Sequence, residues 1–149
     1  MPHAEAQSYR RGMDPIAFTI ELTGEAVELD DGHFWAETRG LDTVFGADQA
    51  LCRRNLELGD DGTLVESGEI SFGADDAVTF RADGTLGPSP DPRVKHGAAV
   101  LTVTGGRGRL AGASGFVTSN FLLGEGGALT DHQQGLLFVE PNGGASETP

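Results

Sequence analysis

Glu66 is the first residue in this chain whose type and surroundings indicate chemistry. It precedes Ile70 and Phe72 at even spacing, so a strand through this segment would place the carboxyl group among apolar side chains. An unpaired buried carboxylate is costly, and burial raises its pKa. Glu66 could therefore donate or accept a hydrogen bond at a substrate carbonyl. The simpler interpretation is a solvated carboxylate near a rim.

Asp131-His-Gln-Gln134 is the second candidate group. A histidine can act as a general base and a glutamine can bind a carbonyl, so His132 and Gln134 have suitable side chains. The alternative is a position at the rim of the fold, because we expect a strand to start at Asp131. Glu66 and His132 are the predicted catalytic residues.

Other kinds of site lack the residues they need. Cys52 is the single cysteine, which excludes an internal disulfide and a multi-cysteine metal site, and we expect a buried, inert thiol. The sequence has no closely spaced histidine pair, so we predict no metal site. The paired aspartates at 30/31, 60/61 and 75/76 coincide with turn signals and are interpreted as turn residues.

The elements that must position these residues are short strands. Apolar and polar residues alternate in several segments, and Gly, Asp and Pro clusters separate them. The expected strands are 16–28, 33–38, 49–58, 64–72, 77–86, 96–104, 115–123 and 131–139.

Consecutive strands joined by tight turns favour antiparallel pairing, and closure removes exposed edges. We therefore predict an all-β fold, a single eight-stranded antiparallel barrel with a ligand-sized lumen. The barrel domain is expected over 15–140, between flexible tails at 1–14 and 141–149, and Tyr9 in the first tail could form a flap over the cavity mouth.

A glycine-rich stretch runs from Thr104 to Gly115. Gly106-x-Gly108-x-x-Ala111 loosely matches a dinucleotide-binding pattern, which requires a helix to follow. The following residues, 116–123, are β-branched and aromatic and predict a strand instead. We therefore interpret these glycines as rim residues that permit positive φ and close backbone approach.

Val103-Thr-Gly-Gly-Arg-Gly-Arg-Leu-Ala-Gly-Ala-Ser-Gly115 also resembles the signature V-x-G-G-x-G-x-[FLY]-x-G-x-x-G of the allene oxide cyclase-like barrels, a calycin-type group that includes dirigent proteins. Gly32-His-Phe34 and the segment 84–88 are compatible with it. Chain size most resembles the small bacterial polyketide cyclases of the spirotetronate Diels–Alderase kind. The resemblance implies a linear polyene held in the lumen, ring closure by [4+2] cycloaddition or a related reaction in antibiotic biosynthesis, no cofactor, and a homodimer.

The resemblance also favours one face of strand 115–123 as lumen-facing, the face with Ser119 and Phe121. Apolar character selects the inward faces of the neighbouring strands, with Arg81 and Thr79 outside and Trp35 facing outward. These side chains could equally fill the barrel without touching a ligand. The predicted substrate-binding residues are Phe34, Ile70, Phe72, Phe80, Leu101, Ser119, Phe121 and Gln134.

The net charge of the chain restricts the classes of partner that it can bind. With 23 acidic and 10 basic residues the formal net charge is −13, which disfavours nucleic acid, an anionic membrane and an acidic carrier protein. We expect a small, neutral, largely apolar partner. The alternative function is a non-catalytic, lipocalin-like carrier of a hydrophobic metabolite. No signal peptide or membrane span is evident, so a cytoplasmic location is expected, which weakens a dirigent-type role in radical coupling.

Overall fold

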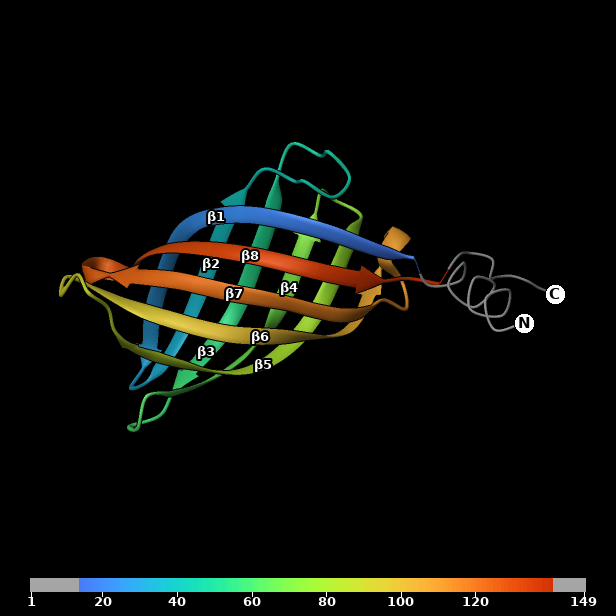
Figure 1. Ribbon diagram of the computed structural model, residues 1–149. Coiled ribbons are helices and arrows are strands. Elements are labelled where there is room, and N and C mark those ends of the chain that lie inside the picture. The colour runs from blue at the N-terminus through green and yellow to red at the C-terminus, as the bar shows by residue number, and fades with distance from the viewer. Residues whose placement is uncertain (1–13, 141–149) are drawn as a thin grey trace.

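The computed structural model describes residues 14–140, which form one closed antiparallel barrel in the order β1 to β8, with β8 paired to β1 (Figure 1). This confirms the predicted all-β fold and the eight-stranded antiparallel barrel; the interior cavity is far smaller than the predicted ligand-sized lumen. The expected tails, with Tyr9, lie outside the described residues except for Asp14. The strands are β1 (Pro15–Asp30), β2 (His33–Gly40), β3 (Ala50–Leu58), β4 (Thr63–Phe72), β5 (Asp76–Pro88), β6 (Val94–Arg107), β7 (Ser114–Gly124) and β8 (Ala128–Phe138).

The connections define two ends of the barrel. We call the end with the β1–β2, β3–β4, β5–β6 and β7–β8 connections the mouth end, and the opposite end, where β1 begins and β8 ends, the base end (Figure 1). At the mouth end, Gly32 and Gly62 adopt φ of 79° and 88°, a conformation that other residues rarely adopt. Among residues 14–140 no helix is long and apolar enough to cross a membrane.

The glycine-rich stretch connects β6 to β7 at the base end. β6 continues through Gly105 and Gly106, beyond its predicted end, and the 3₁₀ turn η1 (Gly108–Leu110) follows. Gly108 has φ of 67°, and a Cβ there would collide with the carbonyl oxygen of Asp75. The next element is strand β7, which confirms the interpretation of these glycines as rim residues rather than a phosphate loop.

Polar contacts link the connections at the base end. Asp42 accepts hydrogen bonds from the backbone N–H groups of Val44, Phe45 and Ala47 at 2.8–3.1 Å. The Arg109 guanidinium lies 3.8 Å from the ring centroid of Phe45. It also donates to the buried Asp76 carboxylate at 2.7 Å, so Asp76 ties η1 to β5 in addition to ending a turn.

The barrel interior contains two apolar clusters. The base cluster is the larger and includes Phe18, Phe72, Phe80, Leu101 and Leu110. The mouth cluster comprises Ala26, Ala36, Leu56, Leu64, Phe121 and Leu129, with Phe34, Leu58, Leu86 and Leu123 partly buried against it. Buried polar side chains lie along the same inward faces, between the two clusters in the strand sequences.

Candidate functional site

A buried polar layer crosses the lumen between the two clusters. We use this name for Arg54 on β3, Glu66 on β4, Ser119 on β7, and Asp131 and Gln133 on β8. Each of the five residues is at most 1% exposed. Each faces inward because side chains alternate along a strand, and the residues two positions away belong to the apolar lining, are small or, for Asp131 and Gln133, are each other.

Asp131 is the best-satisfied member of the polar layer. Its Oδ2 accepts hydrogen bonds from Arg54 Nη2 and from Gln133 Nε2, both at 2.8 Å. Its Oδ1 accepts a third hydrogen bond from Ser119 Oγ, also at 2.8 Å. Donors from three strands therefore hold this carboxylate in place.

Glu66 has far fewer partners. Its Oε1 accepts one hydrogen bond from Arg54 Nη1 at 3.1 Å, while Oε2 is buried without a partner. Burial raises the pKa of Glu66 above its ordinary value; the Arg54 guanidinium opposes this rise and Asp131 adds to it. A raised pKa and a free oxygen are the properties of a carboxyl group that retains its proton and can donate it to a hydrogen bond.

Arg54 in the layer and the neighbouring Cys52 each keep one protonation state. Burial alone would lower the pKa of Arg54, but Asp131 and the other acidic groups around it outweigh that effect, so its pKa is raised and it stays cationic. Burial raises the pKa of the Cys52 thiol to about 11. The Sγ of Cys52 lies 3.9 Å from Gln133 Nε2. Cys52 is therefore a neutral, buried thiol, as predicted.

An enclosed apolar cavity of about 10 Å³ lies on the mouth side of the polar layer. Four of its lining residues are two positions along a strand from a member of the layer: Leu56, Leu64, Phe121 and Leu129. The Arg54 guanidinium lies 5.2 Å from the ring centroid of Phe121. This volume is close to that of one water-sized sphere, so side chains must move before a larger ligand can enter.

Two surface grooves lie next to the cavity at the mouth end. One, of about 380 Å³, lies between the β3–β4 turn and the β5–β6 connection and shares Leu86 with the cavity. The other, of about 360 Å³, lies beside the β7–β8 connection and shares Ala26, Phe34 and Leu123 with it. The half-buried Leu86, Phe34 and Leu123 thus separate solvent-filled grooves from the interior.

The structure places most predicted site residues inside the barrel, but not all at one site. Glu66 and Ser119 are in the polar layer, and Phe34 and Phe121 line the cavity. The other four apolar residues of the prediction belong to the base cluster, on the far side of the layer: Ile70, Phe72, Phe80 and Leu101.

His132 and Gln134 require a correction, because both are exposed on the outer face of β8. β8 begins at Ala128, three residues before the predicted start, so this segment lies in the body of the strand rather than at its rim. The alternation then turns Asp131 and Gln133 inward. Neither His132 nor Gln134 can reach a ligand in the lumen.

Arg54 is the functional residue that the sequence interpretation missed. It shares its strand face with Cys52 and Leu56, both buried, so period-2 alternation was an available signal. A single cation in that position looks like one of the surface charges that surround it, such as Arg53. Within residues 14–140, no group of three or more metal-ligating side chains is placed to hold a metal ion.

No protein-family model matches this chain, and no curated protein matches it. A solved structure with a similar fold is that of the pterocarpan synthase dirigent protein GePTS1. The TM-score is 0.60, and the match covers 87% of this chain and 91% of that chain at 8% sequence identity. At this identity the similarity concerns the fold alone, an eight-stranded antiparallel barrel like that of a dirigent protein.

Proposed function

We propose that the protein is a cofactor-independent cyclase that folds a linear conjugated polyketide intermediate in the mouth half of its lumen and closes a ring by [4+2] cycloaddition or a related reaction. The observation that carries this proposal is the buried polar layer, which contains the unpartnered Glu66 Oε2 and lies two positions along the strands from four residues that line an apolar cavity. Side chains that served only to fill the barrel would not need to include a buried acid.

The apolar wall supplies the larger share of the rate in this mechanism. A flexible polyene loses its conformational freedom on binding, and the lumen holds the diene and the alkene in a near-attack geometry. Such positioning contributes about 7 to 11 kcal/mol in well-oriented systems. Phe34, Phe121 and Leu129 are the cavity residues expected to shape the bound chain.

Glu66 supplies the polar contribution. A carbonyl conjugated to the alkene gains negative charge on its oxygen as the ring closes, and a hydrogen bond from the neutral carboxyl group stabilises that charge. The cavity shares lining residues with the mouth-end grooves, so the substrate enters at the mouth end, past Leu86 or past Phe34 and Leu123. Because the cavity is almost closed before a ligand binds, entry requires these side chains to move apart.

The fold comparison supports a synthetic role in one respect. The dirigent protein with this barrel is named a pterocarpan synthase, so a barrel of this shape is found in a protein named for the formation of a small organic product. The enclosed cavity of about 10 Å³ must open for a carried metabolite as much as for a substrate, so its size does not separate the carrier hypothesis from the cyclase.

The deciding experiment incubates the purified protein with linear polyenes that carry a diene and a carbonyl-conjugated alkene, and follows ring formation by chromatography. We expect wild type to form one cyclic isomer, and Glu66→Leu, which has no hydrogen-bond donor, to form it about 10²–10³-fold more slowly, the usual cost of removing one such hydrogen bond. His132→Ala, on the outer face of β8, is the matched control and should keep the wild-type rate. If the protein binds these polyenes but accelerates ring closure in none of them, the carrier hypothesis is supported instead.

A further inference from the structure

The polar layer contains one more acidic group than it contains cations. Arg54 is its cation, and Glu66 and Asp131 are its two carboxyl groups, all at most 1% exposed. An isolated buried charge is expensive, so a layer of this composition is most stable when one of the two carboxyl groups keeps its proton. The geometry decides which one does.

The hydrogen bonds are divided unequally between the two carboxyl groups. Asp131 receives three donors at 2.8 Å, including one from Arg54 Nη2. Glu66 receives one donor from Arg54 at the longer distance of 3.1 Å, and its Oε2 has none. Charged carboxylates are the ones that collect several short hydrogen bonds, so Asp131 is the ionised partner and Glu66 holds the proton.

We propose that Asp131 is a positioning residue that keeps Glu66 neutral, because it takes the charge of Arg54 for itself and leaves the Glu66 O–H free for the carbonyl oxygen of a substrate. This inference rests on the proposed function for its catalytic meaning, but the protonation state can be measured without any substrate. The other titratable group facing Glu66 is Cys52 on β3, which stays neutral.

The same geometry specifies the class of substrate atom that Glu66 recognises. A neutral carboxyl group with an unpartnered O–H needs an acceptor, and the neighbouring cavity wall is apolar. A carbonyl oxygen on an otherwise apolar chain satisfies that donor. An ammonium group cannot, because it has no acceptor.

The test is a titration of side-chain carboxyl groups by ¹³C NMR on the full chain, with Glu66→Gln used to assign the Glu66 resonance. We expect Glu66 in wild type to titrate above the ordinary range of glutamate. In Asp131→Asn, Arg54 has only Glu66 as a counter-ion, so the Glu66 titration should fall by more than one pH unit. Asp131→Glu retains the charge and should restore the high value. Asp83→Asn, an exposed carboxylate on the outer face of β5, is the matched control and should leave the titration unchanged.

If Asp131→Asn does not fold, the stability of Glu66→Gln toward denaturant tests the protonation state of Glu66 instead. Glu66→Gln replaces one neutral group by another of similar shape, so at neutral pH it should be at least as resistant to denaturant as wild type. If Glu66 is ionised and serves as the counter-ion of Arg54, Glu66→Gln will be strongly destabilised instead, and the proposal fails. The proposal also fails if Glu66 titrates at the same pH in Asp131→Asn as in wild type. A titration as expected without any ring formation would overturn the proposed function alone.

Discussion

At the scale of single residues, Arg54 organises the interior. Its guanidinium donates to Glu66, Ser119 and Asp131, which come from three different strands. Such a network is not an efficient source of stability, since an apolar layer of the same volume is often at least as stable. Removing one partner alone is expensive, because a charge is then left buried. A buried layer of this kind is therefore more easily explained by function than by folding.

The neutral state of Glu66 predicts a specific dependence of stability on pH. Its pKa is raised in the folded protein above the ordinary value of 4.5, so between these two values the folded state binds more protons than the unfolded state. The stabilising contribution is complete below about 4.5 and is lost as the pH rises through the folded pKa. Wild type should therefore lose stability relative to Glu66→Gln over that window.

Urea denaturation of both proteins from pH 4 to pH 9 measures this difference. The difference between the two free energies of unfolding isolates Glu66, because the surface carboxylates contribute equally to both proteins. Above the folded pKa the difference should level off. A difference that stays constant with pH would show that the pKa of Glu66 is the same in the folded and unfolded states.

At the scale of elements, glycines on inward faces let neighbouring strands accommodate large rings. A Cβ on Gly97 of β6 would collide with the ring of Phe121, and a Cβ on Gly135 of β8 would collide with the ring of Phe18. Each phenyl ring therefore lies over a position with no side chain. Phe121 needs this arrangement to pack against both the cavity and the Arg54 guanidinium.

Gly97→Ala should consequently destabilise the barrel by about 1–3 kcal/mol, the usual cost of overpacking. The collision involves a ring that is itself enclosed, so the ring can move only by displacing other side chains. Gly87→Ala is the matched control on the neighbouring strand β5, because a Cβ there meets nothing within 4 Å. Thermal or denaturant unfolding measures both. Equal stability of the two variants would contradict the packing argument.

The strands were predictable because their alternation follows one rule over most of the barrel. The inward face of β5 is largely apolar, so binary patterning identified Phe80 as a lumen residue, whereas the inward face of β7 was selected by the family resemblance. The rule fails for β8. Its inward face carries Asp131 and Gln133 while Leu136 lies on the outside, so apolar character does not distinguish the two faces.

The candidate site was less predictable than the fold for the same physical reason. A buried polar layer replaces apolar side chains with charged ones on the inward face, and the hydrophobic pattern is weakest where the layer lies. Glu66 could be recognised because Ile70 and Phe72 follow it on the same face. Arg54 and Asp131 are identified by their mutual hydrogen bonds, which only the closed barrel brings together.

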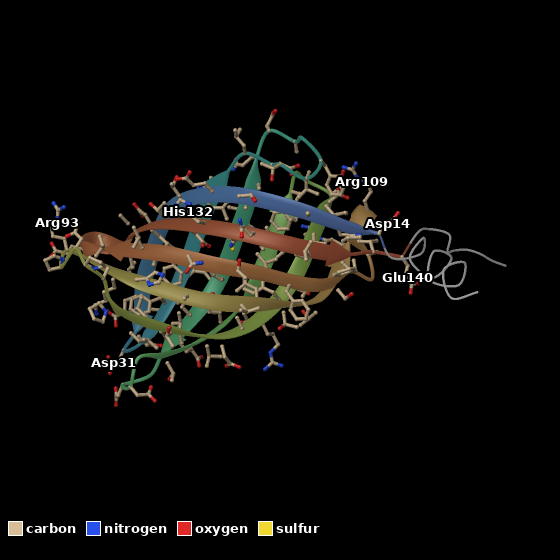
Figure 2. All side chains as sticks on the ribbon, in the orientation of Figure 1. Asp14, Asp31, Arg93, Arg109, His132 and Glu140 are labelled. Carbon is tan, nitrogen blue, oxygen red and sulfur yellow. The ribbon has the colours of Figure 1, made fainter. Side chains whose placement is uncertain are left out.

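At the scale of the whole molecule, the charge is unequally compensated between the two ends. At the base end, Asp76 binds Arg109 and Asp42 caps a loop, while Asp48 and Asp75 are exposed without an ion pair within residues 14–140. At the mouth end, the ion pair among the described residues is that of Asp91 with Arg93. Figure 2 shows Arg93 at the opposite end of the barrel from Asp14 and Glu140. The mouth-end carboxylates without a cationic partner are Glu28, Asp30, Asp31, Glu57, Asp60, Asp61 and Glu125.

This arrangement predicts that the mouth end discriminates against anionic ligands. In water, one carboxylate 10 Å from a unit charge contributes about 0.4 kcal/mol, so several together amount to roughly 1–2 kcal/mol. Decanoate should therefore bind about tenfold more weakly than decanol at low salt. The difference should shrink as ionic strength increases, because the screening length is then about 10 Å or less.

Displacement of the neutral dye Nile red by each amphiphile measures these affinities. The double variant Asp31→Asn with Asp60→Asn removes two exposed mouth-end charges and should strengthen decanoate binding without affecting decanol. Asp48→Asn with Asp75→Asn removes two exposed base-end charges and should change neither affinity, since those charges are far from the entrance. If both double variants favour decanoate equally, the selection arises from the net charge of −13 and not from its distribution. A mouth-end effect alone would mean that the charges around the entrance favour a neutral substrate over an anionic one, because removing charges elsewhere leaves that preference unchanged.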